Sequence, residues 1–141
     1  MQRLLFIWLM LTGIGHSLLG LALAFTAKLA LAAPYFDYLH ARFGVAPRSN
    51  PEQVLLATMV QLSGPTVASW GVLFSSVVYL YRKHGHPLCK YAIYASLLLW
   101  LPLDSLISAY YSLYAHVYLN LSVALLIILP LLALRPEARR T

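Results

Sequence analysis

The sequence predicts an all-α integral membrane protein, built as a single domain over residues 1–141 in which four transmembrane helices form one bundle. Hydrophobic residues make up 61% of the chain and charged residues only 10%, and the mean hydropathy is +0.74. An ordinary soluble domain is about 45–50% apolar and about 25% charged. The apolar residues also gather into four long runs, with one long hydrophilic connection after the first run and short connections after the others. Lipid is therefore the expected solvent for most of the chain.

The first membrane helix is predicted over about residues 4–28. A bilayer core about 30 Å thick needs about 20 helical residues, and this apolar run is long enough. Lys28 would lie near the far interface and extend its ammonium group toward the headgroups. The alternative is a cleaved signal peptide that ends at Ala30-Leu31-Ala32. The length of the run and Pro34, just past that site, argue against cleavage.

A short interfacial segment is predicted between the first and second membrane helices. Its apolar residues would form one face of a helix lying along the membrane surface, with its polar residues turned to water. The apolar face consists of Tyr35, Phe36, Leu39 and Phe43, and the polar face of Asp37, His40 and Arg42. The next helix is expected to begin at Asn50-Pro51, where Asn50 suits the N-cap and Pro51 the first helical position.

Three further membrane helices are predicted over about residues 51–81, 88–109 and 116–134, followed by a basic, disordered cytoplasmic tail over 135–141. Small residues recur around Gln61 at spacings of four and three along the second of the four helices. They are Ala57, Gly64, Ala68, Gly71 and Ser75. Small residues at this period let helix backbones approach closely in lipid. This small-residue face is therefore predicted to pack against another helix.

The basic residues predict that both termini lie in the cytoplasm. In this orientation seven basic residues lie inside: Arg3, Arg82, Lys83, Lys90, Arg135, Arg139 and Arg140. Only three lie outside: Lys28, Arg42 and Arg48. Such an excess on the cytoplasmic side is usual for membrane proteins, and it accounts for the net charge of +6 without a nucleic-acid partner. The expected location is a bacterial inner membrane.

Polar residues within the predicted helices mark a candidate ligand-binding site. Ionisable groups in membrane helices are costly and usually face the bundle interior or a cavity. Each helix contributes a strong polar group between the membrane midplane and the outer headgroups: His16, Gln61, Asp104, His116 and Asn120. His116 and Asn120 are four residues apart and share a helix face. Asp104 is the most demanding of the five, because a buried carboxylate needs a cation, a histidine or a proton.

These five residues favour a non-enzymatic binding or accessory protein, which holds either an apolar ligand with a polar head, such as a lipid or a quinone-like molecule, or a larger membrane partner. A purely structural cluster that fixes helix packing is a second interpretation. The alternative function is an intramembrane enzyme or redox carrier that uses His16, Asp104 and His116. Those side chains suit a b-type haem, a zinc ion or an acid–base pair, and the sequence singles out no one cofactor.

A weaker metal motif lies in the polar turn between the second and third membrane helices. His84, His86 and Cys89 have side chains that suit a soft metal. The neighbouring Arg82 and Lys83 would repel a cation, so a solvated turn is favoured. Cys89 is the only cysteine, which excludes an intrachain disulfide. The expected partners are the lipid bilayer and the ligand or membrane protein named above, and a homo-oligomer is compatible with this layout.

Overall fold

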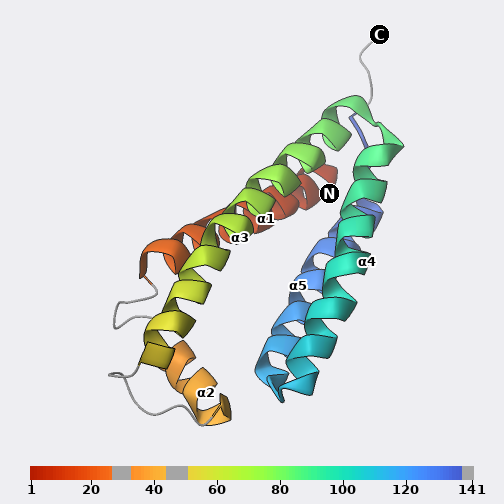
Figure 1. Ribbon diagram of the computed structural model, residues 1–141. Helices are drawn as coiled ribbons and strands as arrows, with labels where there is room; N and C mark the ends of the chain where they lie inside the picture. The colour runs from red at the N-terminus through yellow and green to blue at the C-terminus, as the bar shows by residue number, and fades with distance from the viewer. Residues whose placement is uncertain (27–32, 44–50, 138–141) are drawn as a thin grey trace. The chain divides into compact units, whose positions relative to one another are not determined.

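A computed structural model describes residues 1–26, 33–43 and 51–137, and every regular element within these ranges is an α-helix (Figure 1). The helices are α1 (Gln2–Thr26), α2 (Ala33–Phe43), α3 (Pro51–His84), α4 (Pro87–Tyr110) and α5 (Tyr114–Ala133). The chain divides into two compact units. The terminal unit consists of Met1–Ile14 and Gly71–Thr141, and the middle unit of Gly15–Trp70. α1 and α3 each contribute one part to each unit.

Three of the described helices are long and apolar enough to cross a membrane: α1, α4 and α5. Large apolar side chains on these helices are widely exposed, as at Leu98 (77%) and Leu106 (68%), which suits contact with lipid. α3 is the longest helix, at 34 residues, but small and polar residues lower its hydropathy. The predicted all-helical architecture is thus found, with three apolar candidate spans, one fewer than the four expected from the sequence.

The core of the terminal unit is formed by apolar side chains from α1, α3, α4 and α5. The buried residues are Leu9, Phe74, Val78, Tyr81, Ile93, Leu97, Ala124, Ile127, Leu131 and Leu134. Where a helix contributes several of them, they are three or four residues apart, which is the period of one helix face. The Trp8 indole also donates a hydrogen bond to the Leu126 carbonyl (3.0 Å), which joins α1 to α5.

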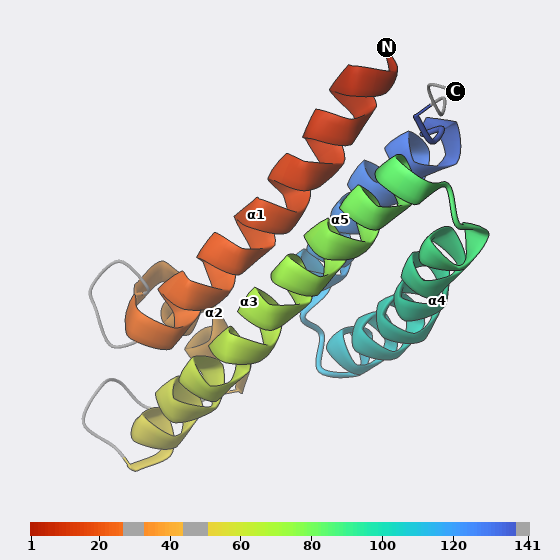
Figure 2. The same ribbon diagram turned by 90° about the horizontal axis from the view of Figure 1, so that it is seen from above.

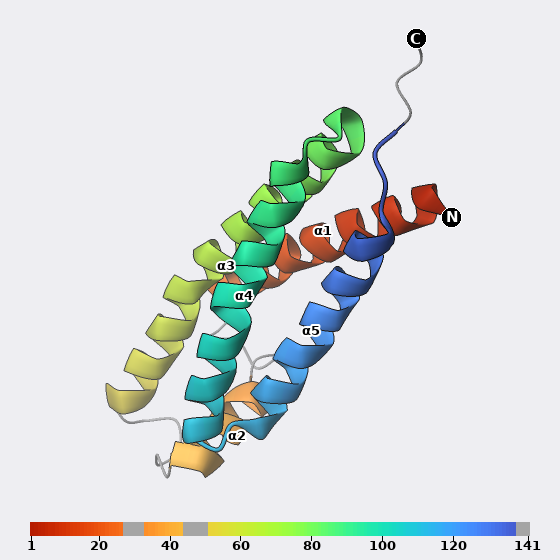
Figure 3. The same cartoon turned by 90° about the vertical axis from the view of Figure 1, so that its right-hand side faces the viewer.

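α4 and α5 run antiparallel as a helical hairpin (Figures 1 and 3). α4 ends in a Schellman motif, in which the Ser112 N–H donates to the Ala109 carbonyl (2.9 Å) and the Leu113 N–H to the Ser108 carbonyl (2.8 Å). Ser112 adopts the left-handed conformation, with φ 58°, that glycine usually supplies at this position. The hairpin connection is shorter than the predicted boundaries imply, so His116 lies within the first turn of α5.

The start of α1, the α3–α4 turn and the end of α5 meet at one end of the terminal unit. The Gln2 side-chain amide donates to the Ala133 carbonyl (3.0 Å), and the Lys90 ammonium group donates to the Leu132 carbonyl (3.4 Å). These bonds satisfy carbonyl groups that the last turn of a helix leaves without intrahelical partners. This end is called the termini end below.

The predicted disorder of the tail is wrong for residues 135–137, which dock onto the α3–α4 turn. The Arg82 guanidinium donates to the Arg135 carbonyl (2.6 Å) and lies 3.3 Å from the Glu137 carboxylate. The Glu137 N–H donates in turn to the Arg82 carbonyl (2.8 Å). Buried Leu134 precedes these residues and anchors the segment. The remaining tail residues, 138–141, lie outside the described part of the chain.

In the middle unit, the small-residue face of α3 packs directly against α1 (Figure 2). A methyl group added at Gly64 would lie 2.6 Å from both the Ala24 amide nitrogen and the Gly20 carbonyl oxygen, so the two backbones are in contact. The Ser17 hydroxyl bonds to the Ala68 carbonyl (3.2 Å) across the same interface.

The same kind of contact continues in the terminal unit, where Gly13 of α1 lies against Gly71 and Ser75 of α3. The prediction that this face packs against another helix is therefore confirmed for Gly64, Ala68, Gly71 and Ser75, and the partner helix is α1.

The predicted interfacial segment is helical and corresponds to α2, with Leu39 buried as its apolar face requires. The prediction that His40 faces water is wrong. Its Nε2 atom is buried without a hydrogen-bond partner among the described residues, and its ring lies 6.4 Å from that of Phe36, one turn earlier. The predicted N-cap Asn50 and the interfacial Lys28 lie outside the described residues.

Candidate functional site

Asp104, His116 and Asn120 come together between α4 and α5, and we call them the hairpin cluster. Oδ2 of Asp104 accepts a hydrogen bond from the Asn120 side-chain amide (2.5 Å) and lies 3.5 Å from Nε2 of His116. Among the described residues, none bonds to the other carboxylate oxygen, Oδ1. One face of the carboxylate is therefore occupied by the protein, and the other is open.

The antiparallel hairpin explains why these residues meet. Asp104 lies six residues before the end of α4 and Asn120 six residues after the start of α5. At about 1.5 Å per residue, both lie about 9 Å from the turn. His116 is one helical turn before Asn120, so both side chains point from the same face of α5 toward α4.

Burial differs sharply within the hairpin cluster. Asn120 is only 2% exposed, whereas the side chains of Asp104 and His116 are 35% and 36% exposed. The buried amide holds the carboxylate in place, because a hydrogen bond to a well-packed partner limits its rotation. The partly exposed acid and imidazole can then meet a molecule from outside the hairpin.

Two serines of α4 belong to this region and were missed in the sequence. The Ser105 hydroxyl lies 3.5 Å from the Asn120 amide nitrogen, and Ser108 is 4% exposed. Asp104 and Ser108 are four residues apart on α4, just as His116 and Asn120 are four residues apart on α5, so each pair shares one helix face. That pattern was a usable signal for a polar face on both helices.

The other two predicted site residues, His16 and Gln61, belong to the middle unit and have neighbours there. The Gln61 side-chain amide donates to the Ala24 carbonyl of α1 (3.2 Å). The His16 ring meets that of Trp70 edge to face, with centroids 4.9 Å apart. The structure thus brings together three of the five predicted residues, and participation of His16 and Gln61 in the same site stays a prediction.

Metal binding has little geometric support in the described part of the chain, where no three His, Cys, Asp or Glu side chains are grouped so that they could hold an ion. The motif of His84, His86 and Cys89 does not form such a group. His86 instead caps α4, because its Nδ1 accepts a hydrogen bond from the Leu88 N–H (3.3 Å). A capping interaction of this kind explains a polar side chain before Pro87 without any metal.

These features describe an all-helical chain that has three helices apolar enough to span a membrane and a polar cluster inside a helical hairpin. Comparison of the chain with protein-family models, with curated proteins and with solved structures finds no match. Its function is therefore argued from the hairpin cluster and from the arrangement of the helices.

Proposed function

We propose that the chain crosses the membrane four times, with α3 as the additional span. Gln2 bonds to Ala133, the last residue of α5, and Arg82 near the end of α3 bonds to Arg135, two residues further on, so Gln2 and Arg82 both lie at the termini end. If α1 crosses the bilayer, the chain must cross back before it reaches Arg82. α3 has 34 residues, which correspond to about 51 Å of helix against a bilayer core of about 30 Å.

The polar residues of α3 are compatible with a span because their hydroxyl groups bond within the helix. Ser69 bonds to the Thr66 carbonyl (2.9 Å), and Ser76 bonds to the Val72 carbonyl (2.9 Å). A hydroxyl satisfied in this way exposes little unpaired polarity to lipid. The contact of the small-residue face with α1 supports the same placement.

The excess of basic residues at the termini end supports a cytoplasmic location for it, in a bacterial inner membrane. We predict that single cysteines at Ser49 and Ser112, in a Cys89→Ser background, react with a membrane-impermeant maleimide added to intact cells. A cysteine at Glu137 is expected to react only after the inner face is opened. Labelling of Ser49 and Glu137 from the same side would contradict the span by α3, and labelling of Glu137 alone in intact cells would reverse the orientation.

We further propose that the hairpin cluster binds the polar head of an apolar molecule. The observation behind this proposal is the open Oδ1 of Asp104, in a side chain that Asn120 fixes and that remains one-third exposed in a membrane helix. An acceptor oxygen selects a head that donates a hydrogen bond, such as a hydroxyl or an amine. A tail that matches the surrounding apolar side chains would remain in the lipid. This corresponds to a lipid-like or quinol-like ligand.

The test is the set of lipophilic molecules that co-purify with the protein in mild detergent, identified by mass spectrometry. Asp104→Asn is expected to reduce the bound species roughly ten- to hundredfold, because a hydrogen bond to a charged acceptor contributes about 1.5–3 kcal/mol. Ser122→Ala is the matched control, since its hydroxyl bonds only to the Tyr118 carbonyl of its own helix (2.8 Å). Equal retention by the wild type and both variants would overturn the proposal.

Acid–base catalysis is a second candidate function, supported by the 3.5 Å separation of His116 and Asp104. A carboxylate beside an imidazole can move a proton on a bound molecule. Adding His116→Gln to the same experiment separates the two functions. A simple binding protein retains the same molecule in the wild type and in His116→Gln, whereas an enzyme whose His116 has been replaced retains its unreacted substrate, which is distinguished from the product by mass or, for an isomerisation, by chromatographic retention time.

A further inference from the structure

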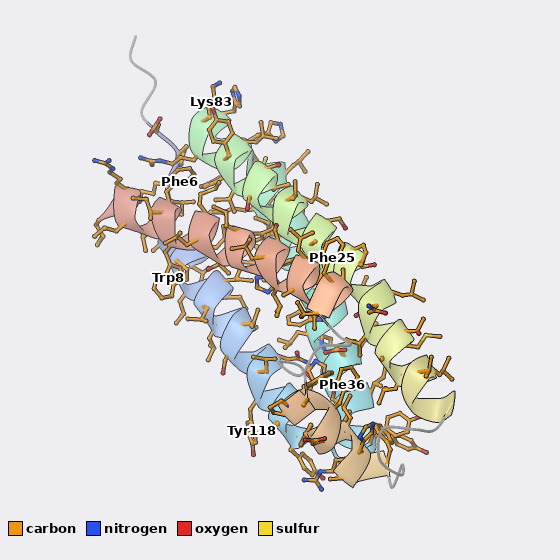
Figure 4. The ribbon with its side chains drawn as sticks, turned by 90° about the vertical axis from the view of Figure 1, so that its left-hand side faces the viewer. Phe6, Trp8, Phe25, Phe36, Lys83 and Tyr118 are labelled. Carbon is orange, nitrogen blue, oxygen red and sulfur yellow. The ribbon has the colours of Figure 1, made fainter. Side chains whose placement is uncertain are left out.

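An open pocket of about 200 Å³ lies at the termini end, on the opposite end of the terminal unit from the hairpin cluster. Its lining residues are Phe6, Tyr79, Arg82, Lys83 and Glu137. Phe6 comes from α1 and Lys83 from the end of α3, and both are seen at this end in Figure 4. Two aromatic side chains, two cations and one carboxylate therefore share a pocket at the termini end.

Arg82 is the most constrained of these residues, because its side chain is only 15% exposed. One guanidinium nitrogen, Nη1, is held by the Arg135 carbonyl at 2.6 Å. The other, Nη2, lies 3.3 Å from the Glu137 carboxylate. A guanidinium group has five N–H donors in a planar fork that matches the oxygens of a phosphate. The fork is thus positioned by the backbone and retains donors for an anion.

The contact with Glu137 is weak enough to be exchanged. The Glu137 side chain is 66% exposed, and its separation of 3.3 Å from Arg82 exceeds the usual length of a charge-assisted hydrogen bond, about 2.7–2.9 Å. Because the Glu137 carboxylate is largely in solvent, water screens its attraction to Arg82 and the pair contributes little to stability. Lys83 lies over the Tyr79 ring, 5.7 Å from its centroid, and adds a second positive charge at the pocket.

We propose that this pocket binds the phosphate of an anionic phospholipid, which displaces the Glu137 carboxylate from Arg82. Lys83 contributes the second charge, and Phe6 and Tyr79 provide apolar contact for the glycerol and the first part of the acyl chains. The choice of a lipid rests on the proposed topology, which places this end in the cytoplasmic leaflet, where anionic lipids attract basic residues. Basic pockets between helices on this side are suited to such headgroups.

The experiment is a native mass-spectrometry titration of the full chain in neutral detergent, with phosphatidylglycerol and phosphatidylcholine of the same acyl chains. The wild type is expected to prefer phosphatidylglycerol. Lys83→Gln is expected to weaken the binding of phosphatidylglycerol about fivefold, because one basic residue near an anionic surface contributes about 1 kcal/mol. Arg82→Gln is expected to weaken it further, and Glu137→Gln to strengthen it, because the competing carboxylate is removed. Inorganic phosphate at millimolar concentration is expected not to displace the lipid.

Lys90→Gln is the matched control, because Lys90 lies at the same end but bonds to the Leu132 carbonyl and does not line the pocket. It is expected to leave phosphatidylglycerol binding unchanged. Should Arg82→Gln fail to fold, as judged by circular dichroism, Lys83→Gln and Glu137→Gln still decide the outcome with opposite effects. Equal binding of the two lipids, equal losses in Lys83→Gln and Lys90→Gln, or displacement by inorganic phosphate would overturn the proposal. Because the titration is made in detergent, its result is independent of the topology test.

Discussion

Gly64→Ala is expected to lower the free energy of unfolding by about 1–3 kcal/mol, the usual effect of overpacking a close contact. The added methyl group would lie 2.6 Å from the amide nitrogen of Ala24 and 2.6 Å from the carbonyl oxygen of Gly20. Both atoms belong to the backbone of α1, so no side-chain rotation can relieve the overlap. The helices would have to separate, which weakens their packing along the interface. Unfolding in mixed micelles, followed by circular dichroism, measures this change.

Gly15→Ala is the matched control, because a methyl group at Gly15 would meet nothing within 4 Å. It lies on the same helix as Gly20 and changes the same residue type. Alanine favours a helix over glycine by about 1 kcal/mol, so this variant is expected to be as stable as the wild type or slightly more stable. Similar unfolding free energies for Gly15→Ala and Gly64→Ala would show that the α1–α3 contact is not close.

The helices were largely predictable from hydropathy, and the reasons for the remaining errors are local. The predicted end of the third membrane helix, at residue 109, is within one residue of the end of α4 at Tyr110. The start of α5 was placed two residues late, because Ser112 forms a turn in which glycine is usual and Tyr114 resembles an interfacial residue. The small-residue face was visible, but its partner was not, because contacts between distant segments leave no periodic pattern.

The candidate site was predictable only where chain geometry determines proximity. Asp104 and Asn120 flank one short turn at equal distances, and His116 is one helical turn from Asn120, so an antiparallel hairpin must bring the three near each other. His16 and Gln61 were selected by their expected depth alone. Two residues at the same expected depth in the membrane need not touch each other. Gln61 bonds to the Ala24 carbonyl of α1.

The docking of the tail could not be predicted for a different physical reason. The tail was predicted to be disordered because arginine-rich chain ends are usually solvated. That prediction considers side chains only and leaves out hydrogen bonds made by the main chain. Residues 135–137 pair with Arg82 through main-chain groups, which any sequence possesses. The pocket at the termini end depends on that pairing, since Glu137 lines it.

Removing the bond between Asp104 and Asn120 is expected to give the second large effect, and a double-mutant cycle measures it. Asp104→Ala and Asn120→Ala should each destabilise the protein in mixed micelles, whereas the double variant should lose little more than either. The expected coupling is about 1.5–3 kcal/mol if the carboxylate is charged, compared with about 0.6 kcal/mol for an average hydrogen bond between membrane helices. The burial of Asn120 supports the larger value, because a hydrogen bond shielded from water has less competition from solvent.

A double-mutant cycle between Asp104→Ala and Ser122→Ala is the control. The losses of stability in these two single variants should add in the double variant, because the Ser122 hydroxyl bonds within α5. Coupling near zero between Asp104 and Asn120 would contradict the hairpin cluster as a bonded unit.

The Asp104→Asn variant then separates a structural role of Asp104 from a role in ligand binding. Its amide can still accept a bond from Asn120, so the fold should retain most of its stability, while the ligand loses a charged acceptor. A variant that folds like the wild type and no longer retains the lipophilic molecule would assign Asp104 to binding, because a residue that only fixed packing would leave retention unchanged.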